Sequence, residues 1–364
     1  PELRSAYNSD YLWGRWRAQF NHKVSAETVA TASWLMWHRD GNGLYGNRYQ
    51  INLRDRRSLA TYDLRQDWSY RASSTFYLRG GWEFAQSGAD YSYHLFREDP
   101  VVSGGVLSGV PRTITLAPAP RNTTTALFLA PRLAVTPALT LEPGLRFDRH
   151  TASQDADTSP RLNAALTLSA RTTLRAAWGV YAQAQGLHEL PVQFGDSTFQ
   201  RSEQAQHRVL SLDHRFATGL NLRVEAYQRL TAHPRPHWLN RYDTYNVFPE
   251  AQTDRLLLAP NSAEAQGVEL LAQRRGHGKF DWTISYALSQ AREKIGLVTL
   301  PGLRDQRHAF YADLTYSPNA KWRFSAAWQY HTGWPITLVN YSLATLSTGS
   351  RVTVRSFGAT LGAQ

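Results

Sequence analysis

Two segments of the chain combine aromatic and histidine side chains with turn-forming residues. The segment Gln86–Arg121 carries Tyr91, Tyr93 and His94, and the segment Ala232–Ala263 carries His237, Trp238, Tyr242 and Tyr245. Rings and imidazoles suit the capture of a chelate or a sugar, and binding residues often lie on loops over a rigid scaffold. We therefore expect these seven residues to contact a ligand. Packing within the loops and contact with lipopolysaccharide are the alternatives.

A second set of candidates consists of charged residues that alternate with apolar ones. Its members are Arg79, Glu83, Arg146, Arg223, Glu225, Glu269 and Asp313. Their spacing of two places them on one face of extended segments. They could form a path for a substrate. The alternative, which we favour, is a polar network that hydrates an interior or holds another domain.

Metal ligation and catalysis find little support in the sequence. Asp40–Gly43 begins like a calcium loop, but Leu44 and Ile51 stand at two ligand positions, so we expect only a loop tip. Pro234 and Pro236 prevent the helix that would bring His233 and His237 together. Without cysteine, a nucleophile elbow or a phosphate loop, we expect no enzyme, no metal site and no cofactor.

The composition narrows the class of protein. The 364 residues are 42% hydrophobic and 19% charged, and no apolar run approaches the length of a membrane helix. The 12 Trp and 18 Tyr suit the two interfaces of a bilayer, although a soluble carbohydrate-binding protein can be as aromatic. The net charge of +11 is spread along the chain without a basic block, which argues against a nucleic-acid partner.

Strict alternation over segments of roughly ten residues recurs along the chain. In Phe280–Ser289, for example, one face reads Phe, Trp, Ile, Tyr, Leu and the other reads Asp, Thr, Ser, Ala, Ser. The segment Thr28–His38 is the weakest case, because Val29, Leu35 and Trp37 lie on one face but Trp34 and Met36 lie on the other. We count about 14 such segments, which predict an all-β protein and favour an antiparallel up-and-down transmembrane β-barrel.

The connections between these segments alternate in length. Short ones with turn residues include Arg71–Ser74 and Ala217–Gly219, and long ones include Asp40–Arg57 and Gln86–Arg121. Outer-membrane barrels have short periplasmic turns and long extracellular loops. A β-propeller is the main structural rival, but it predicts a constant period of four strands, whereas here two-stranded units recur at irregular spacing.

Several motifs then resemble those of the TonB-dependent outer-membrane receptors. The hairpin pattern "SPRL … TLRAxxG" matches Ser159–Leu162 and Thr173–Gly179, and "AxGVEL" matches Ala265–Leu270. Further on, "YtyS-A" is similar to Tyr286–Ala291, "DQRH" to Asp305–His308 and "TGxP" to Thr332–Pro335. The motifs occur in the family's order across Ser159–Pro335.

The resemblance implies an outer-membrane receptor of Gram-negative bacteria with roughly 22 strands and a lumen closed by a plug domain. Such receptors bind a scarce iron chelate, cobalamin or glycan and import it with energy from TonB. Its partners would be outer-membrane lipid, lipopolysaccharide, the TonB complex and this small-molecule or glycan ligand. We expect residues 1–364 to be a fragment of the barrel domain, without plug or final strands. A passive porin-like or structural barrel is the alternative function.

Overall fold

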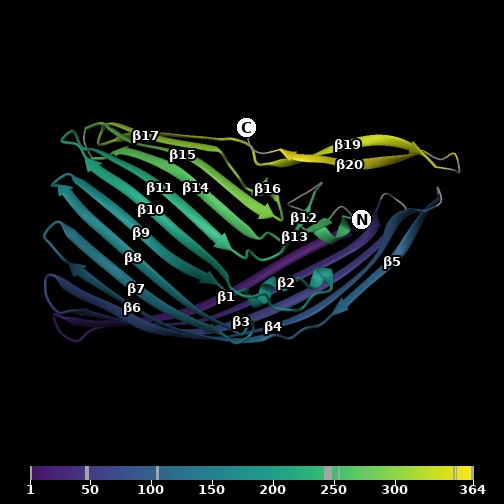
Figure 1. Ribbon diagram of the computed structural model, residues 1–364, viewed down its shortest axis with the longest axis horizontal. Helices are drawn as coiled ribbons and strands as arrows, with labels where there is room; N and C mark the ends of the chain where they lie inside the picture. Colours follow the sequence, from purple (N-terminus) through teal and green to yellow (C-terminus); the bar gives the residue numbers. More distant parts are fainter. Residues whose placement is uncertain are drawn as a thin grey trace.

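The computed structural model describes residues 2–45, 49–103, 106–241, 248–252, 255–276, 278–346, 349 and 351–361. Within them, fourteen strands follow one another in chain order, each antiparallel to the next, and form the curved wall in Figure 1. They are β1 (Glu2–Gln19), β2 (Val24–Tyr45), β3 (Tyr49–Arg71), β4 (Phe76–Ser103), β6 (Arg121–Ala134), β7 (Leu139–His150), β8 (Asp155–Ser169), β9 (Thr172–Gln183), β10 (Glu203–Arg215), β11 (Leu220–Ala232), β14 (Ser262–Arg274), β15 (Phe280–Ile295), β17 (His308–Asn319) and β18 (Trp322–His331). The predicted fold class and the count of about 14 segments are confirmed.

Smaller elements sit beside this wall. The strands β5 (Val106–Leu116) and β16 (Val298–Pro301) extend it by pairing with β4 and β15. Two separate hairpins are formed by β12 (His237–Asn240) with β13 (Arg255–Leu258) and by β19 (Ile336–Thr345) with β20 (Arg351–Leu361). Three 3-10 helices complete the set: η1 (Leu187–Glu189), η2 (Val192–Phe194) and η3 (Pro249–Ala251). Among the described residues, no strand pairing joins β18 to β1, so the wall is part of a barrel.

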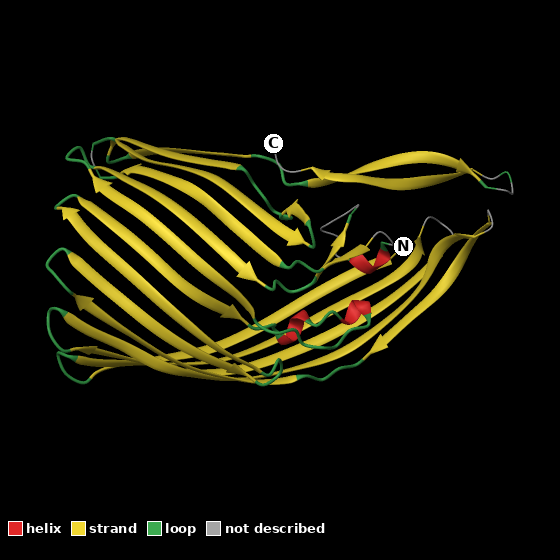
Figure 2. Cartoon of the chain, in the orientation of Figure 1, coloured by secondary structure: helices red, strands yellow, loops and turns green. Residues whose placement is uncertain are grey.

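The short turns gather at one end of the wall, at the left of Figure 2. Their side chains cap the backbone: Asn21 accepts hydrogen bonds from the amides of Lys23 and Val24, and Asn319 does the same for Lys321 and Trp322. Such local acceptors favour tight turns over continued pairing. The turns predicted from the sequence are confirmed, and they mark one rim of the wall.

The register gives the wall two faces. On β15 the outward residues are Phe280, Trp282, Ile284, Tyr286 and Leu288, and apolar residues also occupy outward positions near the short turns on β4, β7 and β18. This band is about ten residues tall, which is the length of strand that crosses a bilayer. The opposite face of the same strands carries the polar residues and defines the lumen side. Separately, no helix of the described residues is long and apolar enough to span a membrane.

The strands β2, β3 and β4 continue far beyond the apolar band, with 22, 23 and 28 residues. The predictions of long loops at Asp40–Arg57 and Gln86–Arg121 were therefore wrong, and Asp40–Gly43 is part of β2 rather than a loop tip. The reason is that the outward face becomes polar above the apolar band, so the apolar outward pattern ends while the ladder of backbone hydrogen bonds continues. The weakly patterned Thr28–His38 is a regular part of β2.

Candidate functional site

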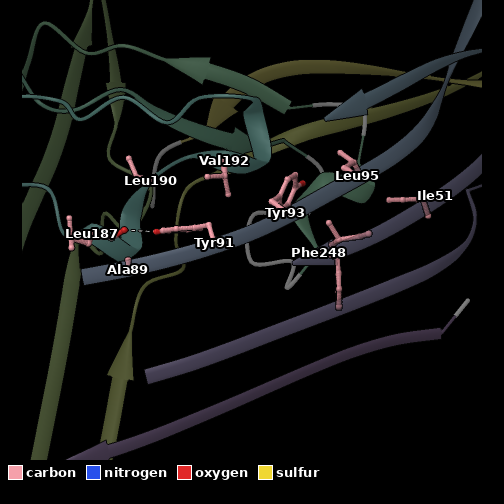
Figure 3. Close-up of a cluster of buried hydrophobic side chains, with 10 residues drawn as sticks. Ile51, Ala89, Tyr91, Tyr93, Leu95, Leu187, Leu190, Val192 and Phe248 are labelled. Carbon is pink, nitrogen blue, oxygen red and sulfur yellow. Dashed lines mark hydrogen bonds between the residues drawn. The ribbon is translucent and has the colours of Figure 1, made fainter. Parts of the chain in front are cut away.

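The extracellular halves of β3 and β4 carry a cluster of buried apolar side chains on the lumen side (Figure 3). Ile51 and Leu53 come from β3, and Ala89, Tyr91, Tyr93 and Leu95 come from β4. Chain segments from two loops cover them with Leu187, Leu190, Val192 and Phe248. Tyr91 and Tyr93, both predicted ligand residues, are 5% and 1% exposed. They therefore lie beneath the loops and support them, rather than standing open to solvent.

The phenol groups of these tyrosines tie the wall to the loops. The Tyr91 hydroxyl donates to the backbone oxygen of Leu187 in η1. The Tyr93 hydroxyl lies 3.5 Å from Oε1 of Glu250 in η3. Burial raises the pKa of both tyrosines, so both hydroxyls keep their protons and act as donors.

A buried ion-pair network lies beside this cluster. Nη2 of Arg39 is 2.5 Å from Oδ2 of Asp55 and 2.6 Å from Oε1 of Glu250. Arg57 binds the same Asp55 through two contacts of 2.9 Å. Burial lowers the pKa of Arg39, but the carboxylates of Glu250 and Asp55 outweigh it and raise the value. The network thus joins β2 and β3 to the loop that carries Glu250, which lies almost 200 residues further along the chain.

Aromatic faces hold the cations of this network. The guanidinium carbons of Arg39 and Arg57 each lie 4.8 Å from the ring centroid of Trp37, and that of Arg57 lies 5.1 Å from the ring of Tyr91. A ring face attracts a cation without neutralising its charge. The site therefore combines fixed positive charge with flat apolar surface.

The two covering loops meet in a second aromatic contact. Phe194 of η2 stacks on Trp238 of β12 with ring centroids 4.0 Å apart and an interplanar angle of 15°. The guanidinium of Arg255 lies 4.0 Å from the Phe194 centroid and 5.6 Å from that of Trp238. Burial lowers the pKa of Arg255 to about 10. Its Nε is buried and has no hydrogen-bond partner among the described residues.

The structure separates the other predicted loop residues. His237 lies 3.6 Å from Glu293, apart from the buried network. His94 is exposed on the outward face of β4, opposite to Tyr91 and Tyr93, and its Nδ1 is 3.0 Å from the Thr115 hydroxyl. Tyr242 and Tyr245, which the sequence also predicted as ligand residues, lie outside the described residues. Of the predicted residues of the second loop that the structure describes, Trp238 is therefore the one that contacts the first loop.

The seven predicted lumen residues all share the face of Tyr91 and Tyr93, as the register shows. Arg79 and Arg146 line an open hollow of about 810 Å³ near the short turns, and Arg146 contacts Glu83 at 3.2 Å. The remaining residues belong to the other half of the wall. Arg223, Glu225 and Glu269 line a hollow of about 460 Å³, and Asp313 lies outside both hollows.

Sequence reasoning missed Arg39, Asp55, Arg57, Glu250 and Arg255. The alternation of Asp55 with Arg57, two residues apart on one face, was a signal that could have identified part of the network. Nothing local marks Glu250. Within the described part of the chain, no group of three or more His, Asp or Glu side chains could hold a metal ion.

Comparison with known proteins supplies the family. The family model described as "TonB dependent receptor-like, beta-barrel" matches residues 2–360. No curated protein sequence matches the chain.

Solved structures agree on the fold. The copper transporter OprC is similar with a TM-score of 0.67 and 14% identity, over 92% of this chain and 54% of OprC. The pyoverdine outer membrane receptor FpvA from Pseudomonas aeruginosa PAO1 has a TM-score of 0.63 and 10% identity, over 96% of this chain and 54% of FpvA. The ferric yersiniabactin uptake receptor FyuA from Yersinia pestis has a TM-score of 0.61 and 13% identity, over 98% and 53%. This chain spans about half the length of these proteins. It belongs to the TonB-dependent receptors, outer-membrane proteins of Gram-negative bacteria, and forms part of their β-barrel.

Proposed function

We propose that this chain is the barrel part of a receptor that binds a scarce extracellular nutrient and imports it with energy supplied through TonB. The nutrient belongs to the iron-chelate, cobalamin or glycan class. The plug and the segment that contacts TonB would lie in other parts of the receptor. The observation that carries the proposal is the group of aromatic and guanidinium side chains on the lumen side of β2–β4, above the apolar band.

The position of this group supports capture from outside. It lies on the parts of β3 and β4 that extend away from the short periplasmic turns, and two loops fold onto it. Trp238, in the second covering loop, is 36% exposed and open to an arriving ligand, whereas Arg39 and Glu250 of the network are 3% and 1% exposed. The similar folds of the pyoverdine receptor FpvA, the ferric yersiniabactin uptake receptor FyuA and the copper transporter OprC favour a metal chelate within the proposed classes.

The covering loops argue against a passive porin. A porin keeps a water-filled channel along its lumen. Here η1 and η2 are held against the wall by the Tyr91–Leu187 hydrogen bond and by a 3.5 Å contact between Arg57 and Gln193. These contacts narrow the lumen on the side of entry, as expected of a receptor that retains its ligand.

Lipid and lipopolysaccharide are the proposed partners of the outward face. The apolar band suits acyl chains. Above it, Arg54 and Arg56 point outward and are exposed, and the Arg54 side chain is 65% exposed although Asp40 lies 4.0 Å away. Cations at this height suit the phosphates of an outer-leaflet lipid.

Growth of a strain that lacks the full-length gene tests the function. Ferric chelates, cobalamin or glycans are supplied one at a time as the limiting nutrient. We expect a growth defect with one class, and the same defect when TonB is inactivated. A Trp238→Ala receptor should show the defect in part, whereas Trp322→Ala on the outward face should not. Growth that is unaffected by loss of TonB, together with passage of small sugars in vesicle-swelling assays, would support the porin and contradict the receptor.

A further inference from the structure

Three arginines surround Glu250 at the extracellular end of the lumen, two of them near its carboxylate and one at its backbone oxygen. Glu250 is 1% exposed and accepts two hydrogen bonds from Arg39, at 2.6 and 3.1 Å. Nη1 of Arg97 donates to the backbone oxygen of Glu250 at 2.6 Å and to that of Gln252 at 3.3 Å. Arg255 lies close enough for its charge to interact with that of Glu250.

Within the part of the chain that the structure describes, the charges around Glu250 do not balance. Arg39, Arg57, Arg97 and Arg255 bring four positive charges. The carboxylates in contact with them are Asp55, Asp99 and Glu250. Arg255 is in contact with two rings but with no carboxylate among the described residues, and its buried Nε lacks an acceptor. Counted over the described residues, the site has one more cation than carboxylates and a buried donor, Nε of Arg255, without an acceptor, and both favour a further anionic oxygen.

Glu250 is not part of the wall. It lies in η3, a single turn in the loop between β12 and β13. Side-chain contacts attach this turn: Arg39 and Arg97 bind it from β2 and β4, and Asn240 donates to the backbone oxygen of Pro249 at 3.1 Å. No backbone ladder of the barrel depends on Glu250, so the carboxylate can leave while the wall stays intact.

We propose that Arg39 and Arg255 form an anion-binding site that the Glu250 carboxylate occupies in the absence of ligand, and that a carboxylate or similar oxyanion of the nutrient takes its place, while Arg97 holds the backbone of the turn. This inference rests on the proposed function and deepens it. It selects an anionic chelate over a neutral glycan. In this proposal Glu250, a residue of the receptor's own loop, competes with the ligand for the anion site.

The energetics favour exchange over simple opening. A guanidinium that loses its carboxylate in a buried site is strongly destabilised. Departure of Glu250 alone would leave Arg39 with Asp55, which it already shares with Arg57. An incoming oxyanion restores the lost pair and also meets the free Nε of Arg255. The loop is therefore released only when a ligand anion arrives, which couples recognition to movement of the loop that carries Trp238.

The test uses the full-length receptor in detergent with citrate alone as the probe, measured by calorimetry. Glu250→Gln removes the internal charge and keeps the size of the side chain. We expect citrate to bind at least about tenfold more tightly to this variant, because an occupied site lowers apparent affinity by the fraction of time that it is free. Glu98→Gln, a change on the outward face of β4, is the matched control and should leave the affinity unchanged.

A second variant keeps the result interpretable if the loop loses its structure. Glu250→Asp retains the charge but reaches less far, and it should raise citrate affinity severalfold. Adding Arg255→Met to Glu250→Gln should remove the gain. Unchanged affinity in both Glu250 variants, or a gain that survives loss of Arg255, would overturn the inference.

The inference and the proposed function can fail separately. Tighter citrate binding by Glu250→Gln, combined with normal growth of the deletion strain on every nutrient, would retain the anion site and reject the receptor function. A TonB-dependent growth defect without any change in citrate affinity would retain the receptor and reject the anion site.

Discussion

Ile284 provides the sharpest test of which face of the wall meets lipid. It is the third of five outward apolar residues on β15, it is 37% exposed, and it stands between Ala272 of β14 and Ala312 of β17. Its position places it near the middle of the apolar band. Replacing it with arginine should therefore lower the free energy of unfolding by about 2–4 kcal/mol, the cost of arginine on the lipid face at the bilayer midplane.

The neighbouring Ser285 supplies the comparison. It points to the lumen side, where it pairs with Leu271 and Tyr311 and lines the hollow of about 460 Å³. An arginine there reaches water and the carboxylates of Glu225 and Glu269, which line the same hollow. Because the charge stays solvated, Ser285→Arg should cost less than about 1 kcal/mol. The two variants differ by one position in sequence and introduce the same side chain.

The assay is reversible unfolding of the full-length protein from phospholipid vesicles by guanidinium, followed by tryptophan fluorescence and by heat-modifiable gel mobility. Ile284→Ala measures the loss of the isoleucine itself, and its cost is subtracted from that of Ile284→Arg. Equal costs for the two arginine variants, or a larger cost for Ser285→Arg, would refute the assignment of the faces. The lumen positions of all seven predicted charged residues would then be wrong as well.

Three further predictions concern close packing, buried charge and pH. Gly81→Ala should destabilise the protein by about 1–3 kcal/mol in the same unfolding assay, because its added Cβ would lie 2.3 Å from the backbone oxygen of Gln66. Asp55→Asn should weaken the extracellular end of β3 by about 3–5 kcal/mol, measured by hydrogen exchange, because two buried arginines share this carboxylate. Burial raises the pKa of Glu189, but hydrogen bonds from the Gly186 amide and from Arg235 outweigh it and hold the pKa below the usual 4.5. The stability that it lends to its loop is present above pH 4.5 and is lost as the pH falls through the lowered pKa, so proteolysis of residues 185–203 should increase there.

Each of these predictions has a matched control. Gly14→Ala adds a Cβ that meets nothing within 4 Å, so it should leave stability unchanged. For Asp55, the control is Asp90→Asn, since Asp90 is 61% exposed and paired only with an exposed Arg121. Glu189→Gln should make the proteolysis of the loop independent of acid pH. Acid sensitivity that survives this change would assign the effect to another group.

The wall was predictable because the alternation of apolar and polar residues tells which side chains point outward and which point inward. Within the bilayer this alternation is strict, since polar side chains on the lipid face are costly. The same rule explains the errors. Tyr91, Tyr93 and Leu95 alternate with Ser92 and His94 as regularly as the residues within the band do. The outward residues are polar there because they face water, so an extended strand resembled a loop. His94 was grouped with its neighbours for the same reason, although it lies on the other face.

The buried network lay beyond sequence reasoning for a different physical reason. Arg39 and Glu250 are 211 positions apart, and their contact depends on how a loop between two later strands folds back over β2–β4. Yet alternation does constrain the outcome. It places Arg39, Asp55 and Arg57 on the lumen side above the band, where the loops bury them. Charged groups that lose their water must find partners. A loop that covers three such residues with net positive charge must therefore supply an anion of its own or leave room for one from outside. Glu250 is such an anion. The Nε of Arg255, which has no acceptor among the described residues, is where we propose that the outside anion binds.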